Sequence, residues 1–367
     1  MAKTIGGEEL MKSNNFEFLR PAFPELADLG GFAERYVFSD PASALVKLRL
    51  FAESMVSAIY SRHQLPRPYQ FNLNDMLNDD MFVSMIPKPV CFKLHQLRVQ
   101  GNKAAHGADT VKPQIPVWLT QEAYDLACWF FLSFCGGSKD ACPAFIAPKP
   151  MAEAEAESQK AGVDRQLAEQ EARMAQILSD LEEARAKAKV AEKSKEELQL
   201  ILIQTQSAAN VLHFDEATTR RRLIDTMLIA AGWNVGANGQ NTAEVVQEME
   251  VLHQPTNSGI GYADYALKHP ESEKPLGVVE AKKTAENAQK GQMQAKYYAD
   301  GLEKMHGQRP VIFFTNGYDL FIWDDTKNEP PRKIYGFHSK DSLQYLHFQN
   351  EHRDPLLAHL TPSALIV

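Results

Sequence analysis

The chain has 367 residues, of which 44% are hydrophobic and 23% are charged, values typical of a globular protein with two or three domains. Its formal net charge of -8 excludes a protein that binds nucleic acid through a general surplus of Lys and Arg, so any DNA binding would need help from other parts. The first residues lack an apolar signal-peptide core and no apolar run could span a bilayer, so we expect a cytoplasmic protein without membrane contact.

Helical periodicity dominates the first region, residues 1–147. Apolar residues recur at helical spacing over 42–60, after the start signal Ser39-Asp40-Pro41. Segments 90–106, which Gly101 is expected to interrupt, and 120–135 have the same pattern, and no alternating strand pattern competes. We predict an all-α N-terminal domain. Its cysteines form no CxxC motif and predict reduced thiols rather than a zinc site or a disulfide framework. They are Cys91, Cys128, Cys135 and Cys142.

Residues 148–207 have a different composition, dominated by Ala, Glu, Lys, Gln and Leu, with no proline after Pro150. A heptad-like seam runs through the segment, weakened by alanines and one lysine. Its first positions are Leu167, Met174, Leu181, Ala188, Lys195 and Leu202. A continuous helix would reach on the order of 80 Å at ~1.5 Å per residue. The segment predicts a helical or coiled-coil linker, and a single solvated helix is the alternative.

Residues 208–340 predict a mixed α/β domain. The segment 215–233 is expected to be a helix that Asp215 caps, with Leu223 and Met227 on one face. Three strands, a second helix and two further strands are expected to follow it. Their ranges are 243–251, 261–267 and 276–283 for the strands, 287–302 for the helix, and 310–316 and 318–325 for the last two strands.

Charged residues gather where one of these strands ends. Glu280 and Lys282 are two apart in "GVVEAKK", so an extended strand points both toward one face. A turn-rich loop joins this strand to the preceding one, and antiparallel pairing would bring Asp264 alongside. Two neighbouring carboxylates raise each other's pKa unless a divalent cation lies between them, and Mg²⁺ suits such oxygen ligands. The carbonyl of Ala281 would be a further ligand, and Lys282 could position or deprotonate a water that attacks a phosphodiester. A simple salt bridge at a strand end is the alternative.

The stretch "ADYAL…GVVEAKK" resembles the D…ExK core of the PD-(D/E)xK nuclease superfamily, although Ala263 replaces the proline of that name. More narrowly, residues 211–330 resemble the endonuclease domain of the restriction (R) subunit, HsdR, of type I restriction enzymes. Members have a Q-x-x-x-Y motif on the next helix, and this chain has "QAKYY" from Gln294 to Tyr298. The resemblance implies a restriction-endonuclease-like α/β fold with a mixed central sheet.

The resemblance also implies roles for single residues. Asp264 and Glu280 would bind the metal and Lys282 would position the water. Gln294 and Tyr298 would support the site and face the scissile DNA. Glu216 would be the acidic residue that many members place on the first helix near the metal, although a carboxylate in a first helical turn also complements the helix dipole.

An R subunit of this family cuts double-stranded DNA with Mg²⁺, works with methylase and specificity subunits, and uses ATP in helicase-like motor domains. The chain has no GxxxxGK[ST] motif, so we expect that it holds the nuclease without the motors, and that residues 341–367 lead toward them.

Two other functions remain open. The helical domain and the linker could form an assembly module that docks onto partner subunits and has no activity of its own. Alternatively, Arg98, Asn102 and His106 lie at helical spacing, a pattern that resembles HEPN-type ribonucleases, although the spacing here is longer than theirs.

Overall fold

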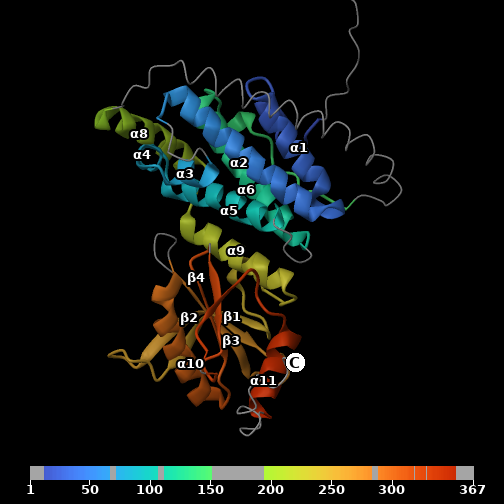
Figure 1. The fold of residues 1–367 in the computed structure, drawn as a ribbon, viewed down its shortest axis with the longest axis vertical. Helices are drawn as coiled ribbons and strands as arrows, with labels where there is room; N and C mark the ends of the chain where they lie inside the picture. Colours follow the sequence, from blue (N-terminus) through green and yellow to red (C-terminus); the bar gives the residue numbers. More distant parts are fainter. Residues whose placement is uncertain are drawn as a thin grey trace, which may run out of the picture. The chain divides into compact units, whose positions relative to one another are not determined.

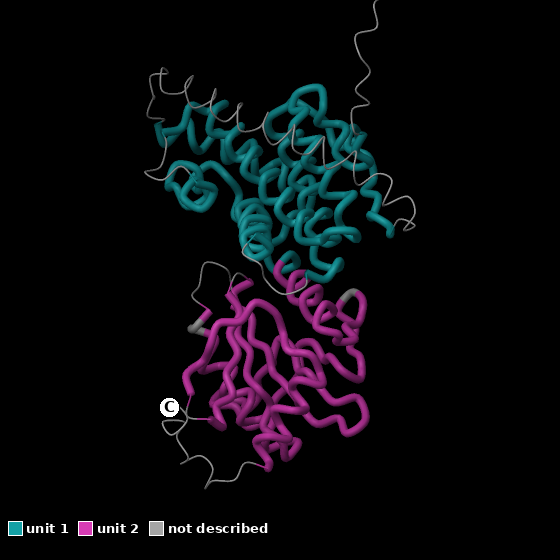
Figure 2. Tube along the Cα trace, turned by 45° about the vertical axis from the view of Figure 1, so that its right-hand side comes forward, with its two compact units in different colours: residues 1–219 teal, residues 220–367 magenta. Residues whose placement is uncertain are grey.

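The protein was analysed as a computed structural model, which describes residues 12–66, 72–105, 111–150, 194–282, 288–317, 319–327 and 329–352. The chain divides into two compact units, residues 1–219 and residues 220–367 (Figure 2). None of the described helices is long and apolar enough to cross a membrane.

All regular secondary structure in the described part of unit 1 is helical. Asp40 accepts a hydrogen bond from the Ser43 backbone N–H at 3.0 Å and so caps the second helix, as the start signal predicted. The helix around Gly101 is continuous, contrary to the expected interruption, because the missing side chain allows a close approach to Arg49 and to the Leu45 carbonyl of the neighbouring helix. The helices are α1 (Pro24–Ser39), α2 (Pro41–His63), α3 (Leu73–Asn78), α4 (Asp80–Met85), α5 (Lys88–Ala105), α6 (Gln114–Phe134) and α8 (Lys195–Val211).

Helix α8 packs into unit 1, although the sequence pattern placed its first part in a linker. Thr205 is fully buried, and its hydroxyl donates to the Met85 carbonyl at 2.8 Å. The indole N–H of Trp129 donates to the Thr205 carbonyl at 3.0 Å. These bonds and the buried Leu198 attach α8 to α4 and α6. The rest of the predicted seam, 151–193, lies outside the described residues.

Unit 2 contains a mixed sheet, as predicted. In the described residues its six strands follow the order β1-β2-β3-β4-β5-β6, and only β3 and β4 run parallel, joined by the crossover helix α10. Asp215 caps α9 by accepting from the Thr218 N–H at 2.7 Å, and α9 runs from unit 1 into unit 2. The elements are α9 (Glu216–Ala230), β1 (Val245–Leu252), β2 (Ile260–Lys268), β3 (Pro275–Ala281), α10 (Gln292–His306), β4 (Val311–Thr315), β5 (Leu320–Trp323), β6 (Arg332–Ile334) and α11 (Lys340–Glu351).

Helices α10 and α11 cover opposite faces of this sheet (Figure 1). The face under α10 is an apolar cluster of strand and helix side chains that includes Ala263, Val278 and Tyr298. On the other face, Leu267 and Leu343 of α11 approach Gly277. Side chains on both faces of β3 are therefore buried. This burial explains why the sequence of the strand is an almost continuous apolar run.

Gly301 marks the closest approach of α10 to the sheet edge. A Cβ atom there would lie 2.5 Å from the Leu252 carbonyl oxygen and from Val251 Cγ1. We expect Gly301→Ala to lower the free energy of unfolding by about 1–3 kcal/mol, because the added Cβ would force α10 away from the backbone of β1. Gly336→Ala is the control, since a Cβ there meets nothing within 4 Å. Urea unfolding of both variants measures the difference, and equal stabilities would contradict this packing.

Candidate active site

The two predicted carboxylates lie where β2 and β3 separate. The antiparallel ladder between these strands extends to the pair Tyr265 and Val279, and the same register places Asp264 opposite Glu280. The Asp264 carboxylate accepts a hydrogen bond from the backbone N–H of Ala281, with Oδ2 2.5 Å from the nitrogen. The Asp264 carboxylate, rather than a backbone carbonyl of β2, is thus the acceptor for this N–H. The bond ties Asp264 to the end of β3.

A break in the alternation of β2 allows this arrangement. Ala263 packs into the cluster under α10, whereas Tyr265 reaches Asp225 on α9 and shares its face with Leu267. Residues two apart would face the same side of a regular strand, so the break falls at Asp264. Opposite it on β1 lies Glu248, a non-glycine residue with φ of 49°. At this distortion the Asp264 carboxylate turns toward β3, where it meets the Ala281 N–H.

The carboxyl groups of Asp264 and Glu280 strongly affect each other. Glu280 is only 4% exposed, and burial together with the neighbouring Asp264 charge raises its pKa to about 7. Burial also raises the pKa of Asp264, with the Ala281 N–H acting in the opposite direction. The register places the two carboxyl groups opposite each other, so ionisation of one disfavours ionisation of the other. The repulsion is greatest when both groups are ionised.

Lys282 is held against Glu280 by bonds to its backbone and its side chain. Its backbone N–H donates to the Thr315 carbonyl at 2.8 Å, which continues the parallel pairing of β3 with β4. Its Nζ donates to Glu280 Oε1 at 2.8 Å and also to the Gln294 side-chain oxygen. With 22% of its side chain exposed, Lys282 remains accessible to solvent.

Helix α10 contributes Gln294 and Tyr298, which are one helical turn apart. The Gln294 Nε2 atom donates to the Tyr298 hydroxyl at 2.7 Å, and Tyr298 is packed in the cluster under α10. Gly291 precedes the helix, and a Cβ there would lie 3.2 Å from Lys282 Cγ. A chain of hydrogen bonds therefore runs from Glu280 through Lys282 and Gln294 to Tyr298. The sequence indicated these residues but not that Gln294 binds Lys282.

The side chains present fit Mg²⁺. No group of three or more His, Cys, Asp or Glu side chains in the described ranges could hold a metal, but Mg²⁺ is usually bound by one or two carboxylates together with water and substrate phosphates. In an extended strand the N–H and C=O of one residue point to the same side. Since the Ala281 N–H meets Asp264, its carbonyl also points to this side, where it is a suitable third oxygen ligand.

The roles of the remaining predicted residues stay predictions. Glu216 is the first residue of α9 and lies on the unit 1 side of the boundary, so its role stays a prediction from the sequence. Arg98 and Asn102 lie on α5, where Arg98 donates to the partly buried His95 ring at 3.4 Å. His106 lies outside the described residues.

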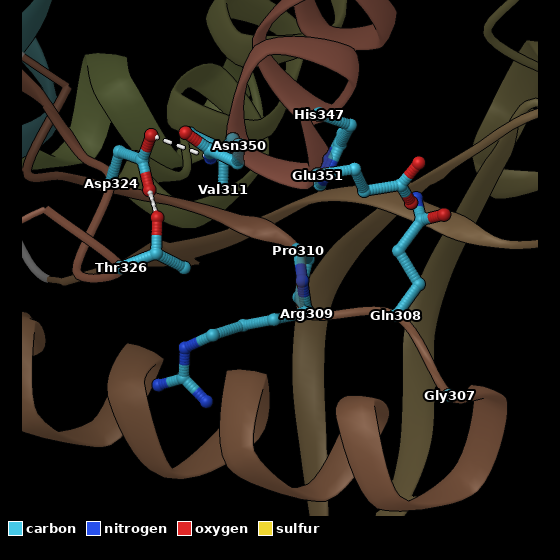
Figure 3. A pocket seen from close by; sticks show the side chains of 10 residues that line it. All are labelled: Gly307, Gln308, Arg309, Pro310, Val311, Asp324, Thr326, His347, Asn350 and Glu351. Carbon is cyan, nitrogen blue, oxygen red and sulfur yellow. Dashed lines mark hydrogen bonds between the residues drawn. The ribbon is translucent and has the colours of Figure 1, made fainter. Parts of the chain in front are cut away.

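A separate pocket of about 300 Å³ opens at the start of β4 (Figure 3). The carboxylates lie near the other end of this strand, where Glu280 pairs with Phe314. Two charged side chains of the pocket, Arg309 and Asp324, are paired within the protein. Arg309 points toward α10 and bonds Asp300 and Glu303 there, and Asp324 accepts from Asn350 at 3.0 Å. The pocket therefore offers no grouping comparable to that of Asp264, Glu280 and Lys282.

Comparison with known proteins agrees with the resemblance seen in the sequence. A family model described as type I restriction enzyme R protein N terminus matches residues 147–331, which is half of the chain. The matched range contains the strands β1 to β5, the helix α10 and the whole carboxylate site. Searches of curated proteins and of solved structures found no match. The chain belongs to the family of type I restriction enzyme R protein N-termini.

Proposed function

We propose that unit 2 is the endonuclease of a type I restriction enzyme and hydrolyses phosphodiester bonds of double-stranded DNA with Mg²⁺. One observation carries this proposal: two carboxylates, Asp264 and Glu280, lie opposite each other and beside a lysine at the end of β3. Such a pair is unfavourable for the fold alone, because neighbouring carboxylates repel each other when both are ionised. A divalent cation removes that repulsion, which gives the arrangement a function.

Each residue of the chain has a definite task in this proposal. Bound Mg²⁺ would activate a water and stabilise negative charge on the phosphate. Asp264, Glu280 and the Ala281 carbonyl hold the ion. Lys282 uses two of its three N–H donors for Glu280 and Gln294, and the third can orient the attacking water. Gln294 fixes the position of Lys282, and Tyr298 fixes Gln294.

The proposed partners follow from the family. In a type I restriction complex, the R protein would work with methylase and specificity subunits, and ATP-driven motor domains would bring DNA to this site. The chain has no phosphate-binding loop of such a motor, so ATP has no proposed site in it.

A plasmid assay tests the proposal. The purified chain, in excess over supercoiled plasmid, should produce nicked and linear DNA in Mg²⁺ or Mn²⁺ and none in EDTA. Asp264→Asn should leave the plasmid intact under every condition. Cleavage that persists in EDTA or in this variant would refute the proposed site.

An intact plasmid with the unaltered protein would instead favour the assembly module. That second candidate rests on α8, whose outer face exposes Leu200 by 68% and Ile203 by 60% although the helix is firmly packed. Exposed apolar side chains on a rigid helix are typical of a protein contact. Retention of a methylase–specificity complex by the immobilised chain, lost in a Leu200→Glu/Ile203→Glu variant, would support it.

A further inference from the structure

Helix α9 is attached to β2 at the residue that follows Asp264. The Tyr265 hydroxyl donates to Asp225 Oδ1 at 3.0 Å, and the Arg221 carbonyl oxygen is 3.5 Å away. Tyr265 is 3% exposed, so this contact is a fixed part of unit 2. The turn of α9 around Arg221 is therefore held close to the strand segment that carries Asp264.

A second contact places the same turn beside β1. Arg221 Nη2 lies 3.9 Å from Glu248 Oε1. The pairs Gln247–Tyr265 and Met249–Ala263 put Glu248 directly opposite Asp264. The start of α9 thus runs along the distorted part of β1 and β2, at the level of the carboxylates.

Three consecutive arginines, Arg220 to Arg222, occupy this turn, and they face different directions. Leu223 and Ile224, which follow Arg220 by three and four residues, are buried, so Arg220 is on the inward side of the helix. Arg220 is half-buried, whereas Arg222 is exposed. The same turn is held against β2 next to Asp264 and beside Glu248 of β1. The inward side of α9, to which Arg220 belongs, therefore faces the strands that carry the carboxylate site.

A phosphodiester at this site would be bound more tightly with a guanidinium such as that of Arg220 beside it. Lys282 is already bonded to Glu280 and Gln294, so it is poorly placed to neutralise a phosphate as well. A guanidinium presents a planar fork of donors that matches two phosphate oxygens. In a chain of net charge -8, a positive group next to the carboxylates would decide where the DNA backbone binds.

We propose that Arg220 is a positioning residue that binds the DNA phosphate beside the Asp264–Glu280 pair. This inference rests on the proposed nuclease function and adds a residue to it. A purely structural alternative exists, in which Arg220 serves as a counter-ion of Asp264 and never contacts DNA. The two alternatives differ in how DNA binding responds to salt.

The test measures binding of a fluorescent DNA duplex by anisotropy, with Ca²⁺ in place of Mg²⁺ so that the duplex stays uncut. We expect Arg220→Gln to weaken binding about tenfold, and to reduce the slope of log K against log [salt] by about 1, the loss of one phosphate contact. Arg222→Gln removes the same charge from the outer face of the same helix and should change the affinity less than about twofold. Arg220→Lys keeps the charge without the fork, so it should keep the salt slope and recover only part of the affinity.

Equal affinity and equal salt slope for Arg220→Gln and Arg222→Gln would overturn the inference. Melting temperatures separate binding from folding: a lower melting temperature in Arg220→Gln with unchanged DNA binding by Arg220→Lys would show the structural counter-ion. Mg²⁺ calorimetry, measured on the same proteins, tests the carboxylates independently. If Arg220→Gln binds Mg²⁺ normally and its DNA binding is unchanged, only the role of Arg220 is refuted. If the unaltered chain itself binds no Mg²⁺, the proposed nuclease is refuted.

Discussion

Replacing Lys282 with alanine is expected to lower metal-dependent DNA cleavage by at least about 100-fold, the usual contribution of a positioned acid–base group. Three effects combine in this variant. The water loses the ammonium that orients it, Gln294 loses its partner, and Glu280 loses the positive charge that favours its ionised form. Without this charge, Glu280 binds its proton more strongly at neutral pH. Single-turnover cleavage rates on plasmid DNA measure the loss.

Lys296→Ala is the matched control for this prediction. Lys296 is likewise a lysine of unit 2 and lies on α10. Its Nζ pairs with Asp300 of the same helix at 3.3 Å, and no contact with Asp264 or Glu280 is found in the described residues. Its removal should leave the cleavage rate within about twofold, since such helical pairs contribute only ~0.3–0.5 kcal/mol to stability. If the two variants cleave at similar rates, Lys282 is merely a salt-bridge partner and the site assignment is wrong.

Replacing Glu280 with glutamine is expected to stabilise the metal-free protein above pH 7. The folded-state pKa of Glu280 is about 7 against an ordinary value of 4.5, so the folded protein binds more protons than the unfolded chain between these values. The free energy of unfolding must therefore fall as the pH rises from about 4.5 to about 7, and it stays low above that range. A shift of this size corresponds to about 3 kcal/mol at most. The pKa of Asp264 is raised as well, so its ionisation also lowers the free energy of unfolding as the pH rises.

The glutamine variant removes this penalty because its amide never ionises. Urea unfolding at pH 5 and pH 8 should show that the variant is about 1–3 kcal/mol more stable than the original protein at pH 8, with little difference at pH 5. Glu271→Gln changes an exposed carboxyl on the turn between β2 and β3 and should have no such effect. A Glu280→Gln protein that is less stable at pH 8 would show that Glu280 contributes to the fold rather than to a metal site.

Local patterns in the sequence were sufficient for the strands β1 to β5, the crossover helix and the charged residues of the site. In contrast, β6 and α11 were not predicted, and α11 lies almost entirely in the part expected to be a linker. The apolar run before Glu280 predicted a buried strand, and β3 is buried between α10 and α11. The turn-rich loop predicted antiparallel pairing with the Asp264 strand, and the register confirms it. These features depend on residues close together in the chain, where periodicity and turn chemistry are informative.

Features that depend on distant contacts could not be read in the same way. Nothing in the residue type of Glu248 predicts its positive φ, which arises opposite the bend at Asp264. The pairing of Lys282 with Gln294 depends on how α10 packs back over β3. The apolar face of α8 fits the helices of unit 1 as well as it fits a coiled-coil seam, and only the Trp129 and Met85 contacts distinguish the two.

The most direct test of the site is Mg²⁺ binding measured by calorimetry in several buffers at pH 7. Because burial and the Asp264 charge raise the pKa of Glu280 to about 7, metal binding at pH 7 should release part of a proton, and the measured heat should change with the ionisation enthalpy of the buffer. We predict binding with release of up to about one proton for the unaltered chain, and loss of binding in both Asp264→Asn and Glu280→Gln. Metal binding that is unchanged in the two variants, or that releases no proton, would contradict a shared Mg²⁺ site at the end of β3.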